Sequence, residues 1–267
     1  MTLISINGNQ LAYNDEGSGP PVILLHGYPF NRSMWKEQVA LLRDNYRVVT
    51  PDLRGHGKSD TVPGPSTMSA MAQDVASLMD ALDISEASIG GLSMGGYIVL
   101  AFYRLFPNRV RSLILADTRA QADSEEGKQN RANQAEKVLA EGMAGIVDSM
   151  LPKMLAPDTV SKRPEVVKRI RDLMLQTKPE GAAAALRGMA MREDQTELLS
   201  QITLPALIVV GREDAVTPLQ DSEKMHHEID GSRLEIIENA GHVSNLEQPE
   251  QFNHALLSFL REVNAGY

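Results

Sequence analysis

The chain has 267 residues, a formal net charge of −9 at pH 7, no cysteine and a hydrophobic content of 42%. This composition supports a sizeable core in one large domain, or in one domain with an insertion, and excludes an intrinsically disordered chain. The acidic balance argues against nucleic acid as a partner, while the lack of cysteine excludes disulfides, thiolate metal ligands and a cysteine nucleophile.

The N-terminal sequence MTLISINGNQLAYNDEGSG has neither a basic region nor a long apolar run, so we predict no signal peptide. No stretch of the chain approaches the ~18 consecutive apolar residues of a membrane span. Together with the lack of cysteine, these features predict a cytoplasmic protein without a membrane partner.

Short β-rich runs alternate with helical stretches in the first part of the chain. The first two runs form a hairpin turned at Asn7-Gly8. The third run, 22–27, is apolar throughout, which is typical of a strand that is covered on both faces. The expected strands are 3–6, 11–14, 22–27, 46–52, 87–91 and 110–117. The expected helices are 31–42, 67–82 and 94–106.

The pattern changes between residues 119 and 203, which read as charged, methionine-bearing helices without any Phe, Tyr or Trp. The alternation of strands and helices then resumes. Alternating units predict an α/β protein with a mostly parallel sheet and helices on both faces. We therefore expect a core of residues 1–118 and 204–267 and a helical cap, 119–203. The later strands are expected at 205–211 and 233–239, and the later helices at 219–228 and 251–263.

The sequence GGLSMGG at residues 90–96 places one serine among four glycines, between a predicted strand and a predicted helix. The spacing Gly91-x-Ser93-x-Gly95 fits the nucleophile elbow, a tight turn that exposes the serine hydroxyl. Such a turn needs strained dihedrals at Ser93, and side chains at 91 and 95 would collide with neighbouring backbone. The N-terminus of the following helix favours negative charge nearby. We predict that Ser93 is a nucleophile.

His242 is the predicted general base for Ser93. It follows the last predicted strand, at the carboxyl edge of the sheet where ligands bind in open α/β folds. Asp214 follows the preceding strand and is predicted to hold His242 in the correct tautomer. The chain order Ser93, Asp214, His242 is the order expected for this constellation. Asp117, at the end of the strand 110–117, is the alternative acid.

Two backbone N–H groups are needed to stabilise an oxyanion. Met94, directly after Ser93, is predicted to supply one. Tyr28 is predicted to supply the other, because the next residue, Pro29, has no N–H. His26 lies in the same loop and is interpreted as a structural residue. The remaining histidines in predicted helices are expected to be surface or packing residues: His226, His227 and His254.

Five segments together resemble the α/β-hydrolase superfamily, and they span nearly the whole chain except the cap. They are VILLHGYPF, PDLRGHGKSD, GGLSMGG, GREDAVTP and NAGHVSNLEQP. The resemblance implies an eight-stranded sheet, a Ser-His-Asp triad and no cofactor, and we expect no metal site. It also implies that PDLRGHGKS is a structural loop, so Asp52, Arg54 and His56 are not expected to be catalytic. Haloalkane dehalogenases and epoxide hydrolases are disfavoured, because they use an aspartate where this chain has Ser93.

The segment HGYPFNRSMW resembles small esterases, enol-lactonases and cofactor-free haloperoxidases (perhydrolases). Acyl-homoserine lactonases of the superfamily are similar in size and also carry a helical cap. We therefore expect a serine carboxylic-ester hydrolase that acts on small esters or lactones with a modest apolar acyl group. The alternatives are an N-acyl-homoserine or enol lactonase, a perhydrolase, and a ligand receptor that keeps the triad without turnover.

Two features of the predicted cap bear on the substrate. Its methionines could line an apolar pocket or pack the cap on the core: Met143, Met150, Met154, Met174, Met189 and Met191. Its basic residues are interpreted as a solvated helix face rather than an anion or carrier-protein dock: Lys162, Arg163, Lys168, Arg169 and Arg171.

Overall fold

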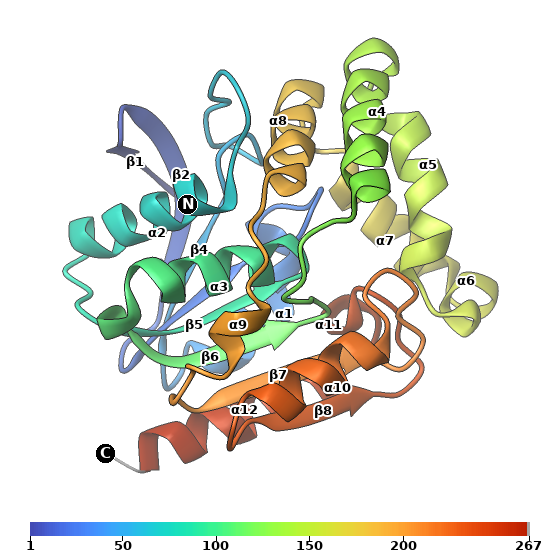
Figure 1. Cartoon of the computed structure of the whole chain (residues 1–267). Helices are drawn as coiled ribbons and strands as arrows, with labels where there is room; N and C mark the ends of the chain where they lie inside the picture. Colours follow the sequence, from blue (N-terminus) through green and yellow to red (C-terminus); the bar gives the residue numbers. More distant parts are fainter. Residues whose placement is uncertain (266–267) are drawn as a thin grey trace.

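An eight-stranded sheet organises the chain in the computed structural model, which describes residues 1–265 (Figure 1). The strands are β1 (Thr2–Ile6), β2 (Asn9–Glu16), β3 (Pro21–Leu25), β4 (Arg47–Pro51), β5 (Ala87–Leu92), β6 (Val110–Ala116), β7 (Ala206–Gly211) and β8 (Arg233–Ile237). Their order in the sheet is β1-β2-β4-β3-β5-β6-β7-β8. Only β2 pairs antiparallel, with β1 and β4, and the other pairs are parallel. The expected mostly parallel eight-stranded sheet is confirmed.

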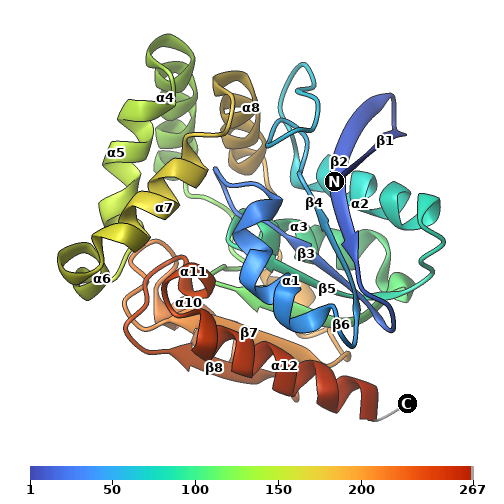
Figure 2. The ribbon, with the colours of Figure 1, turned by 180° about the vertical axis from the view of Figure 1, so that it is seen from behind.

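Helices cover both faces of this sheet, as expected for parallel strands that must be buried on both sides. Figure 1 shows α2 (Met68–Ala81), α3 (Met94–Leu105) and α10 (Leu219–Glu228) in front of the sheet. Figure 2 shows α1 (Lys36–Leu42) and α12 (Pro249–Ala265) on the opposite face. Every residue of β5 and β7 is buried, which shows that these two strands are covered on both faces.

The helix expected at 31–42 is divided in the structure. Asn31 accepts a hydrogen bond from the Ser33 N–H and starts a 3₁₀ turn, Arg32–Trp35, which leads into α1. Asparagine at this position satisfies a backbone donor that the first turn of a helix leaves unpaired. The turn buries Met34 and Trp35, which anchor the loop after β3 to the core.

Residues 119–203, called the helical segment below, connect β6 to β7 and lie above the carboxyl ends of the strands (Figure 1). Within the segment, α4 packs against α8, and α5 packs against α4 and α7. Its helices are α4 (Glu125–Glu141), α5 (Met143–Met154), α6 (Pro157–Lys162), α7 (Pro164–Met174), α8 (Pro179–Ala190) and the short α9 (Thr196–Leu199).

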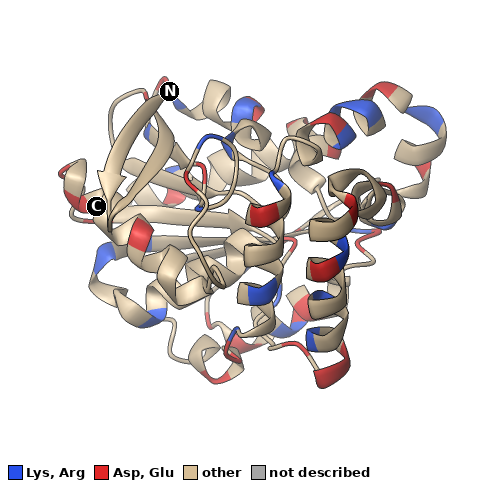
Figure 3. Cartoon of the chain, turned by 90° about the horizontal axis from the view of Figure 1, so that it is seen from above, with Lys and Arg blue, Asp and Glu red and all other residues tan. Residues whose placement is uncertain are grey.

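Two basic residues of the helical segment do more than face solvent. Arg163 and Arg169 donate hydrogen bonds of 2.6 and 2.8 Å to the carbonyl oxygens of Glu247 and Leu246 in α11 (Ser244–Glu247). These two residues therefore also connect the helical segment to α11, in addition to the solvated role expected from the sequence. The other three pair with exposed carboxylates: Lys162 with Asp158, Lys168 with Asp172 and Arg171 with Asp148. Figure 3 shows basic and acidic residues interspersed along these helices.

None of the helices within residues 1–265 combines the length and the apolar character needed to cross a membrane.

The turn between β5 and α3 has the strained geometry that the sequence predicted. Ser93 has a φ of 56° and a ψ of −113°, a backbone conformation that residues with a side chain rarely adopt. A Cβ added to Gly91 would lie 2.2 Å from the backbone carbon of Gly95. A Cβ added to Gly95 would lie 2.2 Å from the carbonyl oxygen of Leu25. Only glycine fits at both positions, so the chain can reverse sharply at Ser93.

We expect Gly95→Ala to lower the free energy of unfolding by about 3 kcal/mol, because the clash is with backbone that cannot rotate away. The corresponding fall in Tm is roughly 6–12 °C. The control is Gly145→Ala in α5, where an added Cβ would meet nothing closer than a Glu141 side-chain oxygen at 3.7 Å. That substitution should stabilise the protein by about 0.5–1 kcal/mol. Calorimetry decides: a Gly95→Ala protein as stable as the wild type would contradict this account of the turn.

Candidate active site

Ser93, His242 and Asp214 come together at the carboxyl edge of the sheet. The Ser93 Oγ lies 2.7 Å from Nε2 of His242. The other ring nitrogen of His242, Nδ1, lies 2.8 Å from Oδ2 of Asp214. The three residues follow β5, β8 and β7, and parallel strands bring their carboxyl ends to one edge of the sheet. The structure therefore joins in one hydrogen-bonded chain the three residues that the sequence predicted.

The Asp214 carboxylate is held by its own turn. Its Oδ1 accepts hydrogen bonds from the N–H groups of Val216 and Thr217, at 2.8 and 3.0 Å, and its Oδ2 accepts from the Thr217 hydroxyl at 2.8 Å. Burial raises the pKa of Asp214, but His242 and the bonds from Thr217 outweigh it, so the net pKa falls below the ordinary value. An ionised Asp214 accepts the Nδ1–H of His242, which leaves Nε2 as the acceptor for the Ser93 hydroxyl.

His242 is buried and fixed through its backbone as well as its ring. Its N–H donates to the carbonyl oxygen of Met154 in the helical segment at 2.7 Å. Burial lowers the pKa of the ring, but the charge and hydrogen bond of Asp214, with a smaller effect of Asp117, raise it further. The net pKa of His242 lies above its ordinary 6.5.

Asp117, the alternative acid, has other partners. Its Oδ1 accepts from the Gly211 N–H at 2.8 Å, and its Oδ2 accepts from the hydroxyl and N–H of Ser244 at 2.6 and 3.2 Å. Burial, followed by the charge of Asp214, raises its pKa to about 7. In the part of the chain that the structure describes, it makes no hydrogen bond to His242. Asp117 instead fixes the backbone at Gly211, shortly before Asp214, and at Ser244, shortly after His242.

The two predicted oxyanion donors flank the elbow. Met94 is the first residue of α3, and Tyr28 follows Gly27, where an added Cβ would lie 3.4 Å from the Ser93 Cβ. Within residues 1–265, neither the Met94 N–H nor the Tyr28 N–H donates a hydrogen bond to another group. Both amides are therefore available to an oxygen atom that a bound ligand would bring.

His26 connects the loops that follow β3 and β4. Its Nε2 accepts from the Leu53 N–H and its Nδ1 donates to the Gly27 carbonyl oxygen, both at 2.9 Å. Its ring lies 4.9 Å from the ring of His56. Burial lowers the pKa of His26 to about 4 and that of His56 to about 3, so both rings are neutral at pH 7. These contacts agree with the structural role expected for His26.

The other polar residues set aside in the sequence also have structural partners. Asp52 accepts from the Arg32 and Lys58 N–H groups, each at 2.8 Å. Arg54 forms an ion pair with Asp74. The histidines expected on helix surfaces are all exposed: His226, His227 and His254.

Ser93 and His242 open into a cavity of about 70 Å³ between the sheet edge and the helical segment. The helical segment contributes Arg131, and three of the six methionines noted in the sequence line the same space: Met150, Met154 and Met189. The remaining walls come from residues on the sheet side: Tyr28, Tyr97 and Val216.

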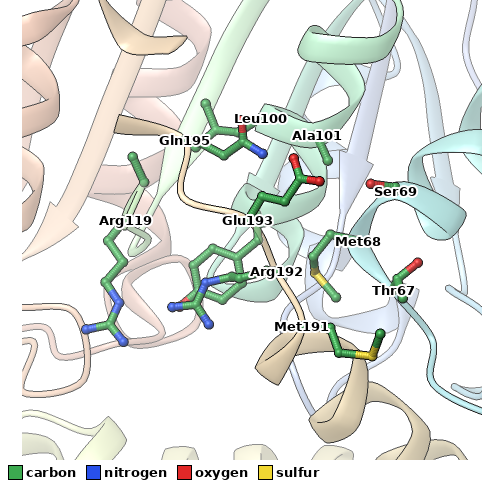
Figure 4. Close-up of a pocket in the computed structure, with 12 residues that line it drawn as sticks. Thr67, Met68, Ser69, Leu100, Ala101, Arg119, Met191, Arg192, Glu193 and Gln195 are labelled. Carbon is green, nitrogen blue, oxygen red and sulfur yellow. The ribbon is translucent and has the colours of Figure 1, made fainter. Parts of the chain in front are cut away.

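A second cavity, of about 170 Å³, lies next to the first and shares Tyr97 with it. Figure 4 shows Arg119, Arg192 and Gln195 around it. The Arg192 guanidinium lies 4.3 Å from the centre of the Tyr97 ring, a cation–π contact.

Sequence reasoning missed Tyr97 and Arg131. Tyr97 lies four residues after Ser93, one helical turn along α3, and that spacing could have placed it near the Ser93 side chain. Arg131 had no comparable signal, because it is one charged residue among many in α4. No group of three or more His, Asp or Glu side chains in residues 1–265 is arranged to hold a metal ion.

Comparison with known proteins identifies a family and individual proteins that are similar to this chain. The alpha/beta hydrolase fold family matches residues 20–249. The 3-oxoadipate enol-lactonase 2 of Acinetobacter baylyi is 33% identical over 92% of this chain and 90% of that protein. A thermophilic esterase from Thermogutta terrifontis, solved with malate bound, is 44% identical with a TM-score of 0.94, over 98% of this chain and 97% of that one. The enol-lactonase from Burkholderia xenovorans is 31% identical with a TM-score of 0.91, over 97% and 100%.

The pKa of His242 can be measured by NMR titration of its imidazole. We expect a value above 6.5 in the wild type and a clearly lower value in Asp214→Asn, because burial remains while the carboxylate is lost. Asp117→Asn should lower the pKa by a smaller amount. If Asp117→Asn had the larger effect, Asp117 rather than Asp214 would be the electrostatic partner of the ring.

Proposed function

This chain belongs to the α/β-hydrolase fold family and is a hydrolase of the esterase or lactonase type, and we propose that it cleaves its substrate through Ser93, His242 and Asp214. The observation that carries the proposal is the hydrogen-bonded chain from Asp214 through His242 to the Ser93 hydroxyl, at 2.8 and 2.7 Å. That chain ends in a cavity where an ester carbonyl can meet the hydroxyl.

The first step is attack of the Ser93 Oγ on the carbonyl carbon. As the C–O bond forms, Nε2 of His242 takes the hydroxyl proton, and the ionised Asp214 stabilises the resulting imidazolium. The N–H groups of Met94 and Tyr28 donate to the oxyanion, each contributing about 3 kcal/mol of transition-state stabilisation. The imidazolium then gives its proton to the departing alcohol oxygen, which leaves an acyl group on Ser93.

Water completes the reaction. His242 takes a proton from a water molecule that attacks the acyl carbonyl, and the proton returns to Ser93 when the acid leaves. In a lactone the alcohol oxygen is part of the acyl group, so the same two steps yield a single hydroxy acid.

We propose that the helical segment acts as a cap, 119–203, over a core of residues 1–118 and 204–267. Support comes from Met150, Met154 and Met189, which lie on the cap side of the Ser93 cavity. Unbranched, flexible side chains of this kind fit irregular apolar groups. The small size of the cavity favours a short acyl group.

Enol-lactones are the second candidate class of substrate. Two relatives that share about one third of their residues with this chain over nearly its whole length are named enol-lactonases. The proposed machinery serves an acyclic ester and a lactone equally well. Measuring kcat/KM for short-chain ethyl esters and for enol-lactones of similar size will show which class is preferred.

The Ser93→Ala substitution should lower kcat for p-nitrophenyl butyrate by about 10⁴-fold or more, because it removes the attacking atom. Asp214→Asn should lower it by about 10³–10⁴-fold. Ser200→Ala is the matched control, since Ser200 is exposed and remote in sequence from all three residues. Ester hydrolysis at the wild-type rate by a folded Ser93→Ala protein would overturn the proposed mechanism.

The pH dependence of kcat/KM should report His242, which must be neutral to accept the proton. Because its pKa is raised, activity should fall on acidification from a higher pH than a free imidazole would require. In Asp214→Asn the fall should move to lower pH. Asp117 also titrates near pH 7, so the profile of Asp117→Asn is needed alongside. A wild-type profile without any acid limb between pH 5 and 8 would contradict the assignment of His242 as the base. The ordinary histidine pKa, about 6.5, lies within this range.

A further inference from the structure

One charged side chain reaches the cavity that holds Ser93. Arg131 extends from α4 into the wall of this cavity, and its side chain is 20% exposed. Its Nε and Nη2 donate to Asp123, while among residues 1–265 the one acceptor for its Nη1 is the sulfur of Met189, at 3.4 Å. A thioether is a weak acceptor, so this edge of the guanidinium still has N–H groups to offer a ligand.

A second unused donor lies in the same wall. The Tyr28 hydroxyl is buried and, among the described residues, has no hydrogen-bond partner. Burial raises the pKa of Tyr28, against a smaller opposing effect of the nearby Arg131 charge, so the phenol keeps its proton. A buried hydroxyl without a partner costs free energy unless a ligand or water supplies an acceptor.

The charges around Arg131 do not balance. Asp123 is the shared carboxylate of three arginines: it also accepts from Arg192 at 2.9 Å and from Arg119 at 3.1 Å. Burial raises the pKa of Asp123, but the arginines lower it to about 2, so it supplies one full negative charge. Asp221 adds only a distant contact to Arg119, at 4.0 Å. The cluster therefore keeps excess positive charge, although the chain as a whole carries −9.

We propose that Arg131 and the Tyr28 hydroxyl bind a carboxylate carried by the substrate, so that the protein prefers esters or lactones with an acidic group to uncharged analogues of the same shape. This proposal rests on the proposed hydrolysis at Ser93 and names the class of substrate. Two donors that line one cavity, an arginine and an unpartnered hydroxyl, can serve the two oxygens of a carboxylate. The methionines of the cavity then contact the short carbon chain between the carboxylate and the reacting carbonyl.

The test compares two esters of nearly equal shape, monoethyl succinate and ethyl 4-methylpentanoate, in which an isopropyl group replaces the carboxylate. The readout is the ratio of their kcat/KM values. Wild type should favour the acidic ester, and Arg131→Gln should reduce the ratio by about 10- to 100-fold, mainly through KM. Tyr28→Phe keeps the backbone N–H and should reduce it by about 3- to 10-fold.

The matched control is Arg187→Gln. Arg187 is an arginine of α8 whose side chain is 41% exposed; it pairs with Glu136 and does not line the Ser93 cavity, so its loss should leave the ratio unchanged. Arg131→Gln should still fold, because Asp123 keeps Arg119 and Arg192 as partners. A ratio that is equal in wild type and in Arg131→Gln would overturn the proposal.

Binding separates this proposal from the proposed function. Titration calorimetry of monoethyl succinate with Ser93→Ala should show binding that is lost in Ser93→Ala/Arg131→Gln. If wild type hydrolyses the neutral ester and the acidic ester neither binds better nor reacts faster, the carboxylate site is wrong and the hydrolase proposal stands. If wild type hydrolyses neither these esters nor enol-lactones of similar size, but Ser93→Ala binds the acidic ester through Arg131, the proposed hydrolysis at Ser93 fails and the carboxylate site stands.

Discussion

The backbone turn at Ser93 is the constraint on which the rest of the site depends. A φ of 56° at a serine costs of the order of 1–3 kcal/mol and persists only where the surroundings hold it. The Ser93 N–H donates to the Ala116 carbonyl at 2.9 Å, and the Thr118 hydroxyl donates to the Ser93 carbonyl at 2.8 Å. Because both bonds come from the end of β6, the sheet itself maintains the turn and directs the hydroxyl toward His242.

Buried carboxylates hold the loops around this turn, mainly through backbone N–H groups. Asp117 accepts from Gly211 and Ser244, so it connects the loops that carry Asp214 and His242. Glu247 accepts from the Gly241 and Ala156 N–H groups at 2.7 and 2.9 Å, so it connects the loop of His242 to the helical segment. A buried carboxyl group that lost these donors would be left without hydrogen-bond partners, which is costly whether the group is ionised or protonated. The position of His242 therefore depends on how the helical segment packs against the loop after β8.

The overall charge of the protein is negative, whereas the arginine cluster beside the Ser93 cavity is positive. Acidic residues outnumber basic ones in the chain as a whole, yet three arginines converge on one aspartate beside the Ser93 cavity. Charges in solvent are screened within about 10 Å at ordinary salt, whereas partly buried groups are screened much less. A ligand inside the cavity thus experiences the nearby arginines more strongly than the acidic surface.

Local patterns in the sequence determined the strands, most of the helices, the sheet class and the Ser93 turn, because each depends on residues close together in the chain. Sequence also narrowed the expected carboxylate partner of His242 to Asp214 or Asp117, since both follow parallel strands that end at one edge. Only the tertiary structure decided which of them contacts His242, that Arg163 and Arg169 anchor the helical segment, and that Arg131 and Tyr28 line one cavity. These contacts join elements far apart in the chain, and their geometry depends on how helices pack against the sheet, which no local periodicity encodes.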